Sequence, residues 1–262
     1  MVITNDVSLL TFVPFTFVVL SGLAPDTRRA LTIPVVCMQT IAANLGSMLT
    51  PIGNPQNLYL YGKSGMRMAE FLLLMLPYTV VSLLLLVGWA VAVCRKQASS
   101  CIGALPEQPN ATADRKIILL DAVLFAVCLL AVVRVLPYGV AFAAVLVCTL
   151  CADRSTLRNV DYSLLLTFVA FFIFIGNLGR IPAFSGWLQA VLAGREVLVA
   201  VLASQITSNV PAALLLSGFT DKTAALIIGT NLGGLGTLIA SMASLISYRQ
   251  IARELPEEKG RY

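Results

Sequence analysis

The sequence predicts an all-α membrane protein: a multispanning helical bundle with two inverted repeats, re-entrant hairpins and discontinuous helices. Three observations support this fold class. The chain of 262 residues is 58% hydrophobic and only 12% charged, whereas soluble proteins carry about 25% charged residues. Several uncharged runs reach the length of about 17 residues that a membrane-crossing helix needs. Glycine, proline, asparagine and hydroxyl residues interrupt some of these runs, and such residues disfavour an unbroken helix.

Charge and composition exclude several classes of function. The formal net charge is +5, but the basic residues lie in short connections between apolar runs and therefore indicate membrane orientation, not a nucleic-acid surface. The chain contains no histidine, which excludes histidine-liganded metals and histidine bases. It also has no Gly-x-Ser-x-Gly motif. We therefore expect no enzyme, no catalytic residue, no resident metal and no cofactor other than a transient coupling sodium ion or proton.

The first repeat is predicted to occupy residues 1–94. A polar tip at 4–6 leads into an apolar arm at 7–25, followed by a broken run at 30–62 and a full-length span at 71–94. The chain begins at a polar tip, without the basic start and apolar centre of a signal peptide. We therefore expect that N-terminal helices of a longer protein precede this sequence.

The run at 30–62 carries the strongest local signal. As one helix it would be about 50 Å long, well beyond the ~30 Å hydrocarbon core. Its middle contains Gly46, Pro51, Gly53 and Pro55. These prolines cannot donate to the helical ladder, and these glycines permit unusual backbone angles. We expect two half-helices joined by an unwound segment, which is tolerated inside a bilayer only where it lines a cavity or packs against protein.

The second half follows a polar loop at 95–116, which we place in the cytoplasm. The second repeat, at 117–248, is predicted to contain three spans, a short interfacial helix, a hairpin and a broken helix, before a cytoplasmic tail at 249–262. The hairpin is split by polar residues at 205–211, which leaves two arms of about ten residues that are too short to cross a bilayer. The last run is interrupted at 230–237.

The two broken runs resemble each other. Asn-Leu-Gly occurs at 44–46 and at 231–233, and Thr-x-Ile occurs at 50–52 and at 237–239, both with an offset of 187 positions. Twelve of the 18 Lys and Arg residues fall on the face that carries the long loop and the tail, which makes that face cytoplasmic. With this orientation the two repeats run in opposite directions. Inverted repeats with discontinuous helices are typical of secondary transporters.

Residues in the four polar breaks are the candidates for binding a substrate or ion. Helix ends exposed at a break carry about half a unit charge, so bare amides can hold an anion and bare carbonyls can hold a cation. No basic residue lies within any break, so an anion would depend on amides, hydroxyls and asparagines, and a neutral hydroxyl-rich solute would fit the same groups. A structural alternative is that these small polar residues only mediate helix packing. The candidates are Thr4, Asn5, Asp6, Asn44, Gly46, Ser47, Thr50, Gly53, Asn54, Asn57, Thr207, Ser208, Asn209, Thr230, Asn231, Gly233, Gly234 and Thr237.

Asp6 is the one carboxylate placed in a break. An intramembrane acid is costly to bury and is a functional candidate by default. It could be neutralised by sodium or could carry a proton, which would couple transport to an ion without histidine. The structural alternative is that Asp6 caps the arm that follows it.

These motifs together resemble the ion transporter superfamily of permeases, which includes citrate-transporter-like permeases, arsenite permeases, sodium/proton antiporters of the NhaD type and divalent anion/sodium symporters. The resemblance rests on Thr-Asn-Asp-Val at 4–7 running into Phe-Val-Pro-Phe at 12–15, the segment 44–57, Ser-Asn-Val-Pro at 208–211 and Gly-Thr-Asn-Leu-Gly at 229–233. It implies that four polar tips, two from hairpins and two from unwound helices, meet around substrate and cation.

The first tip is Thr-Asn-Asp and not the Ser-Asn-Thr of the dicarboxylate branch, which favours the arsenite-permease and antiporter side. We therefore expect a multi-pass transporter of the inner (cytoplasmic) membrane that moves a small anion or inorganic oxyanion by alternating access, coupled to sodium or protons. One alternative is a sodium/proton antiporter that uses Asp6; another is a non-transporting fragment or assembly partner. The expected partners are the lipid bilayer and the solute, with a homodimer as one candidate assembly and no nucleic acid.

Overall fold

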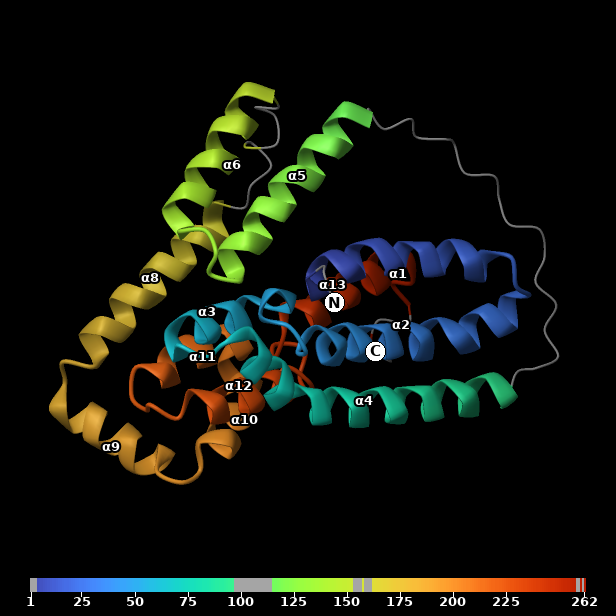
Figure 1. The fold of residues 1–262 in the computed structure, drawn as a ribbon. Helices are drawn as coiled ribbons and strands as arrows, with labels where there is room; N and C mark the ends of the chain where they lie inside the picture. Colours follow the sequence, from blue (N-terminus) through green and yellow to red (C-terminus); the bar gives the residue numbers. More distant parts are fainter. Residues whose placement is uncertain (1–3, 97–114, 153–156, 158–161, 258–259, 261) are drawn as a thin grey trace. The chain divides into compact units, whose positions relative to one another are not determined.

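The structure, a computed structural model, describes residues 4–96, 115–152 and 162–257 and the single residues 157, 260 and 262. Every element in these residues is helical, which confirms the all-α prediction. Most of the predicted loop at 95–116 lies outside the described residues. The helices are α1 (Asn5–Ser21), α2 (Pro25–Ser47), η1 (Pro51–Gly53), α3 (Pro55–Ser64), α4 (Met68–Lys96), α5 (Arg115–Val132), α6 (Tyr138–Ala152), α8 (Tyr162–Leu178), α9 (Pro182–Leu192), α10 (Glu196–Thr207), α11 (Asn209–Ser217), α12 (Thr223–Leu232) and α13 (Met242–Glu254) (Figure 1).

The chain divides into two compact units, which we describe separately. Unit 1 comprises Met1–Pro106 and Ile173–Tyr262, and unit 2 comprises Glu107–Phe172. In unit 2, α5 packs against α6. The turn that ends α5 is closed by the backbone carbonyl of Leu130, which accepts hydrogen bonds from the amides of the fifth and sixth residues after it, at 3.0 and 3.2 Å. All the candidate residues lie in unit 1.

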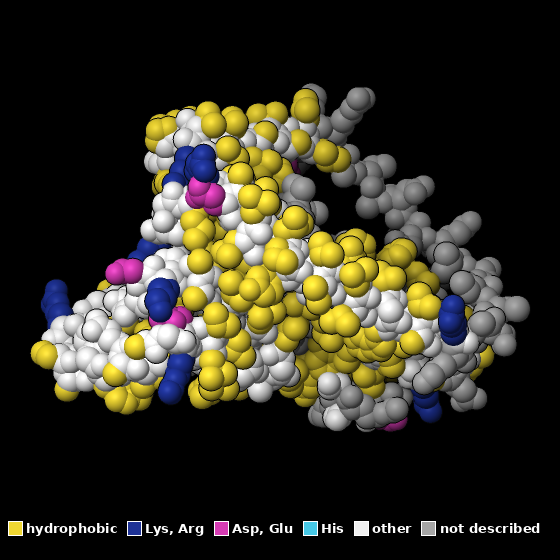
Figure 2. Space-filling view, turned by 60° about the horizontal axis from the view of Figure 1, so that its bottom comes forward, with side chains coloured by type: hydrophobic (Ala, Val, Ile, Leu, Met, Phe, Trp, Pro, Cys, Tyr) yellow, Lys and Arg dark blue, Asp and Glu magenta, His cyan; other side chains and the backbone are white. Residues whose placement is uncertain are grey.

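Two described helices are long and apolar enough to cross a membrane: Thr27–Ser47 within α2 and Met68–Val93 within α4. A third span results if α8 and α9 are counted as one broken helix. Five of the eight leucines of α4 are exposed, among them Leu84 at 66% and Leu85 at 70%. Figure 2 shows hydrophobic side chains over much of the visible face. Large exposed apolar surfaces of this kind suit lipid better than water.

The arm α1 buries one stripe of side chains. Asn5, Leu9, Val13, Phe17 and Leu20 are buried at the three- to four-residue spacing of a helix face. This stripe packs against α2 and α13, which lie alongside α1 (Figure 1). The polar tip residue therefore lies at the end of a hydrophobic contact face, which fixes its position.

The two hairpin arms that follow the polar tips pack in a reciprocal way. The arm α1 contacts α2 and α13, and the arm α11 contacts α12 and α3. Each arm thus touches the first half of its own broken helix and the second half of the other repeat's broken helix. Because the second half-helix of each repeat packs against the hairpin arm of the other repeat, the two breaks come close together. The opposite orientation of the repeats in a membrane stays a prediction, because packing does not define the sides of a membrane.

The first predicted interruption is present but shorter than the predicted unwound segment 44–57, because Asn44 and Gly46 remain helical in α2 and Asn57 is helical in α3. The helix α2 ends at Ser47 and α3 begins at Pro55, with the single 3₁₀ turn η1 between them. Thr50 and Asn54 have extended backbone angles (φ −119° and −141°). A Cβ on Gly53 would lie 1.9 Å from the backbone oxygen of Ser47. The chain returns so close to the end of α2 that only glycine fits at this position.

The second interruption is displaced from its prediction at 230–237. The helix α12 continues through Asn231 to Leu232, and the unwound segment is 233–241. The prediction placed the break too early because an asparagine disfavours a helix interior, whereas here its side chain bonds the carbonyl of Ile227 one turn earlier. Gly236 lies in the left-handed region with φ +121°.

The second hairpin turns at one residue. Ser208, with φ +76°, separates α10 from α11, so the interruption predicted at 205–211 is much narrower than expected. Gln205 lies in the last turn of α10, and Pro211 lies in the first turn of α11, where a missing N–H costs little. The arms have 12 and 9 residues.

Candidate functional site

Asn44, in the last turn of α2, is buried with 3% of its surface exposed. Its Oδ1 accepts a hydrogen bond from Asn5 Nδ2 at 3.2 Å and another from Ser241 Oγ at 2.9 Å. Asn5 is the tip of the first hairpin arm, and Ser241 directly precedes α13 in the other repeat. One asparagine therefore joins its own hairpin tip to the second repeat.

Asn231, in the last turn of α12, has the corresponding role and is 2% exposed. Its Nδ2 donates to Asn57 Oδ1 at 2.6 Å, and its Oδ1 accepts from Asn54 Nδ2 at 3.2 Å. Asn54 directly precedes α3. The pairs Asn44/Asn231 and Asn54/Ser241 both have the offset of 187 positions, so the asparagine of each break bonds the residue that begins the other repeat's second half-helix.

We call this set of buried polar side chains the crossed network. Ser47 completes it, because its Oγ lies 2.9 Å from Asn54 Oδ1 and 2.8 Å from the carbonyl oxygen of Asn44. All seven members are at most 4% exposed. They are Asn5, Asn44, Ser47, Asn54, Asn57, Asn231 and Ser241.

The crossed network contains helix ends of both signs, because α2 and α12 end at it with partial negative charge. The half-helices α3 and α13 both begin at it, so two helix N-termini, with their partial positive charge, meet there. Asn54 precedes α3 without a side-chain cap bond, whereas Ser241 Oγ accepts from the amide of Ala243 at 3.0 Å. Glu196 is the one ionisable side chain among the described buried polar residues, and it lies at the far end of α10.

Two buried amide nitrogens have no acceptor among the described residues: Asn44 Nδ2 and Gln56 Nε2. Gln56 is 1% exposed and lies in the first turn of α3, between two candidate residues. Buried donors without partners are costly. Such N–H groups are able to donate hydrogen bonds to the oxygens of an anion.

Gln205 holds the second break from outside it. Its Nε2 donates to the carbonyl oxygens of Gly233 and Leu235, both at 2.8 Å, and its Oε1 accepts from the amide of Thr237 at 3.0 Å. Thr237 Oγ1 returns a hydrogen bond to the Gln205 carbonyl at 3.0 Å. Thr237 is thus bound to the hairpin and is not a member of the crossed network.

The tip of the second hairpin packs on the same break. The amide of Asn209 donates to the carbonyl of Ala240 at 2.9 Å. A Cβ on Gly234 would lie 2.9 Å from Asn209 Nδ2, and one on Gly233 would lie 2.8 Å from the side chain of Ser204. Both glycines therefore allow the hairpin to pack closely against the second break.

Several candidates lie outside the crossed network. Thr207 is exposed and donates to its own helix at Ala203 O, and Thr230 is buried and donates to Leu226 O. Asp6 Oδ1 is buried and accepts no hydrogen bond from a described residue. The Thr4 carbonyl accepts from Ser8 Oγ at 3.1 Å, Ser208 Oγ lies 3.4 Å from Ala240 O, and Gly46 lies within α2. The Thr50 carbonyl accepts from Asn57 Nδ2, a member of the crossed network, at 3.4 Å.

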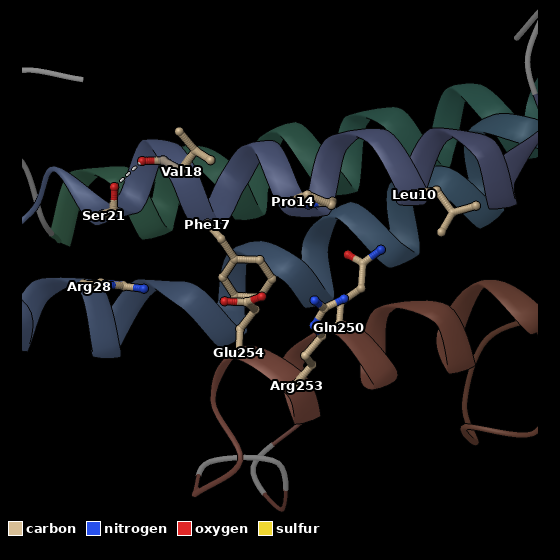
Figure 3. Close-up of a pocket in the computed structure, with 9 residues that line it drawn as sticks. All are labelled: Leu10, Pro14, Phe17, Val18, Ser21, Arg28, Gln250, Arg253 and Glu254. Carbon is tan, nitrogen blue, oxygen red and sulfur yellow. Dashed lines mark hydrogen bonds between the residues drawn. The ribbon is translucent and has the colours of Figure 1, made fainter. Parts of the chain in front are cut away.

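Two of the cavities that border these elements are lined by residues from both halves of the chain. One of about 360 Å³ is lined by Thr237 and its neighbours in the second break, by Thr40 of α2 and by Tyr262, whose hydroxyl donates to Thr40 Oγ1 at 3.0 Å. The other, of about 580 Å³, lies between α1, α2 and α13 (Figure 3). None of the candidate residues lines this second cavity; its charged members are Arg28, Arg253 and Glu254.

Sequence reasoning missed Ser241, Gln56 and Gln205. A signal for Ser241 existed, because it lies 187 positions after Asn54, but serine and asparagine do not match by identity. Gln205 was visible only as the first polar residue of the interruption predicted at 205–211. Gln56 lies next to the first break, but the neighbouring asparagines were sufficient to explain the polar character of that segment.

Comparison with known proteins identifies relatives over nearly all of the chain. The family model described as "Citrate transporter" matches residues 1–247. The inner membrane protein YbiR of Escherichia coli (strain K12) is 33% identical over 259 residues, covering 94% of this chain and 65% of the relative. The uncharacterized transporter MJ0456 of Methanocaldococcus jannaschii is 31% identical over 267 residues, covering 94% of this chain and 66% of the relative. No solved structure matches the chain significantly.

Proposed function

The chain belongs to the citrate transporter family, and from this premise we propose that it is the substrate-binding part of a secondary active transporter in the inner membrane. The family confirms the resemblance to the ion transporter superfamily and the expectation that the protein is not an enzyme. We propose that the solute is a small anion or inorganic oxyanion. Sodium or protons would drive it by alternating access.

The crossed network is the observation that carries this proposal. It places two helix N-termini and several asparagine side chains at one buried point, without a lysine or arginine among its members. Main-chain and side-chain amides hold anions at helix N-termini without basic residues. The free donors Asn44 Nδ2 and Gln56 Nε2 add capacity for anionic oxygens.

Alternating access fits the same geometry. The crossed network includes hydrogen bonds between the two repeats, so a solute held there contacts both. A movement of one repeat relative to the other would then break the hydrogen bonds that join the repeats and open the site to one side of the membrane. We regard the network in this structure as closed, because its members are buried.

The direct test is uptake by proteoliposomes that contain the complete protein, because the chain spans 65% and 66% of the two relatives. Citrate, dicarboxylates and arsenite would be offered under an imposed sodium or pH gradient. We expect one of them to accumulate, and Asn44→Ala and Asn231→Ala to reduce uptake at least about tenfold, since transition between states needs these contacts. Exposed Gln189 on α9 provides the control Gln189→Ala.

Failure of every anion to accumulate under either gradient would contradict the proposal. If uptake is unchanged in both asparagine variants, the protein is still a transporter, but the crossed network is not its binding site. Thermal unfolding of each variant, with and without the transported anion, separates lost binding from lost folding. We expect the anion to raise the unfolding temperature of the parent protein only.

A second candidate is sodium/proton antiport through Asp6. The observation in its favour is that Asp6 Oδ1 is buried without a hydrogen-bond donor, so a proton or a sodium ion would satisfy it. Vesicles without any anionic solute would then show sodium-driven proton movement that Asp6→Asn abolishes. Sodium-driven proton movement that is unchanged in Asp6→Asn would remove this candidate.

A further inference from the structure

Gln205 is a polar residue that is not part of the proposed binding site. It belongs to the arm α10, not to the crossed network, yet four hydrogen bonds of 2.8 to 3.0 Å join it to the second break. The segments that they connect are 28 to 32 positions apart in the chain. These bonds are therefore a tertiary connection between the hairpin and the break.

The chemistry of the glutamine side chain suits the backbone that it contacts. Unwinding at 233–241 leaves carbonyls and amides without helical partners, and such groups need partners inside a membrane protein. A primary amide offers two donors and one acceptor in one plane. Gln205 uses both kinds, since it donates to Gly233 and Leu235 and accepts from Thr237.

The break is shaped around this side chain. A Cβ on Gly236 would lie 2.4 Å from Gln205 Oε1, and Gly236 has φ +121°. Glycine is therefore needed both for the backbone angle and for the approach to the amide. The loop and the glutamine side chain fit together as one packed unit.

The hairpin also holds the far end of the break. Gln205 binds residues 233–237, and the amide of Asn209, across the tip, donates to Ala240 O. Both ends of the unwound segment are thus attached to the hairpin. By contrast, the first break is attached to its own following helix, where Asn57 Nδ2 reaches Met48 O and Thr50 O at 3.4 Å each.

We propose that Gln205 is a positioning residue that makes the second hairpin and the second break move as one body during transport. This inference rests on the proposed transport function. Gln205 acts through the backbone that it holds and does not touch the solute. Without it, the break moves independently of the hairpin, and the conformational step slows while the binding groups remain.

The first experiment needs no transport and measures amide hydrogen exchange of the complete protein in detergent micelles. Gln205→Met keeps the length of the side chain and removes its donors and acceptor, so exchange at 233–241 should accelerate at least about tenfold. Gln205→Glu, which turns an acceptor toward two carbonyls, should do the same. Exchange at 48–54 should not change, and Gln189→Met on α9 is the matched control.

Unchanged exchange at 233–241 in Gln205→Met would overturn the proposal. So would equal acceleration at both breaks, because it would mean that Gln205 only supports the fold in general. If the Gln205 variants do not fold, Thr237→Val removes one of the four bonds and should accelerate exchange at 233–241 about threefold. No acceleration in that variant would also contradict the connection.

The second experiment uses the uptake assay. We expect Gln205→Met to lower the maximal rate at least about tenfold and to change KM less than about threefold, because the solute contacts remain. A raised KM with an unchanged maximal rate would assign Gln205 to binding and overturn the positioning role. Absence of uptake in the parent protein would refute the proposed function, while the exchange result would still decide whether the connection exists.

Discussion

The two breaks carry matching Asn-Leu-Gly motifs but differ in how they are held. In the first break Pro51, Gly53 and Asn54 are buried, and the chain packs on the end of α2. In the second break residues 236–239 are exposed, and a glutamine from the hairpin supplies the hydrogen bonds. A repeated motif thus marks the region in which a helix unwinds, while neighbouring residues decide how firmly the unwound segment is held.

A functional difference follows from this contrast. The first break is a tight point between α2 and α3 with little room for movement, because its backbone is within contact of Ser47. The second break borders the cavity of about 360 Å³ that Thr237 and Thr40 line. We therefore expect the first break to act as the fixed part of the site and the second, with its hairpin, as the moving part.

The largest expected effect that tests this contrast comes from Gly53→Ala. The added methyl group would lie 1.9 Å from a backbone oxygen of Ser47, which cannot rotate away. We expect a loss of at least about 3 kcal/mol of stability, or no folded protein. Thermal unfolding in detergent measures it. Gly62→Ala is the matched control, since nothing lies within 4 Å of its Cβ position and alanine favours a helix.

Gly236→Ala serves as the counterpart in the second break. Its methyl group would meet a side-chain atom, Gln205 Oε1, at 2.4 Å. A side chain can move, so we expect a smaller loss of about 1–3 kcal/mol, mostly from the backbone angle. If Gly236→Ala destabilised the protein more than Gly53→Ala, our assignment of the fixed and moving parts would be wrong.

The next effect is the coupling across the repeats. Double-mutant cycles for Asn54→Ala with Asn231→Ala, and for Asn44→Ala with Ser241→Ala, should each give a coupling energy of about 1 kcal/mol, because each pair shares a buried hydrogen bond. The cycles would be measured by thermal or chemical unfolding of the detergent-solubilised protein.

The control cycle combines Asn54→Ala with Ser241→Ala, for which no shared hydrogen bond exists in the structure. Its coupling should be smaller than that of the two crossed pairs. Equal coupling in all three cycles would mean that the two breaks share stability only through general packing. Coupling near zero in both crossed pairs would contradict the crossed network itself.

The smallest effect is expected at Thr207, a candidate that the structure places outside both the crossed network and the connection made by Gln205. Its hydroxyl is exposed and bonds its own helix at 3.0 Å. Thr207→Val should change stability by less than about 0.5 kcal/mol and leave uptake unchanged. A strong loss of uptake with normal stability would show that the hairpin tip contacts the solute in another state.

Much of the fold could be predicted from the sequence, because the signals are local. Proline and glycine in a long apolar run predict an unwound segment wherever the run folds, and both interruptions are present. The exact limits were less predictable. Asn231 disfavours a helix interior by itself, but its bond to Ile227 O and its partners in the first break keep it helical.

The site was only partly predictable for the same reason. Asn5, Asn44, Ser47, Asn54, Asn57 and Asn231 are candidates that the structure brings together, and amide-rich breaks suggested them. Ser241 and Gln205 escaped because serine before a helix and glutamine in a helix are ordinary residues. Their roles arise from partners 197 and 28 to 32 positions away.

The sequence by itself determined that this chain is helical, belongs in a membrane and unwinds close to the two Asn-Leu-Gly motifs, because apolar length and backbone chemistry act over a few residues. Only the tertiary structure decided which amide meets which. A hydrogen bond depends on two groups arriving within about 3 Å of each other, and the packing of α1 on α13 and of α11 on α3 sets that distance. Each hairpin arm packs on the second half-helix of the other repeat, and this packing brings the separate polar interruptions together in one network.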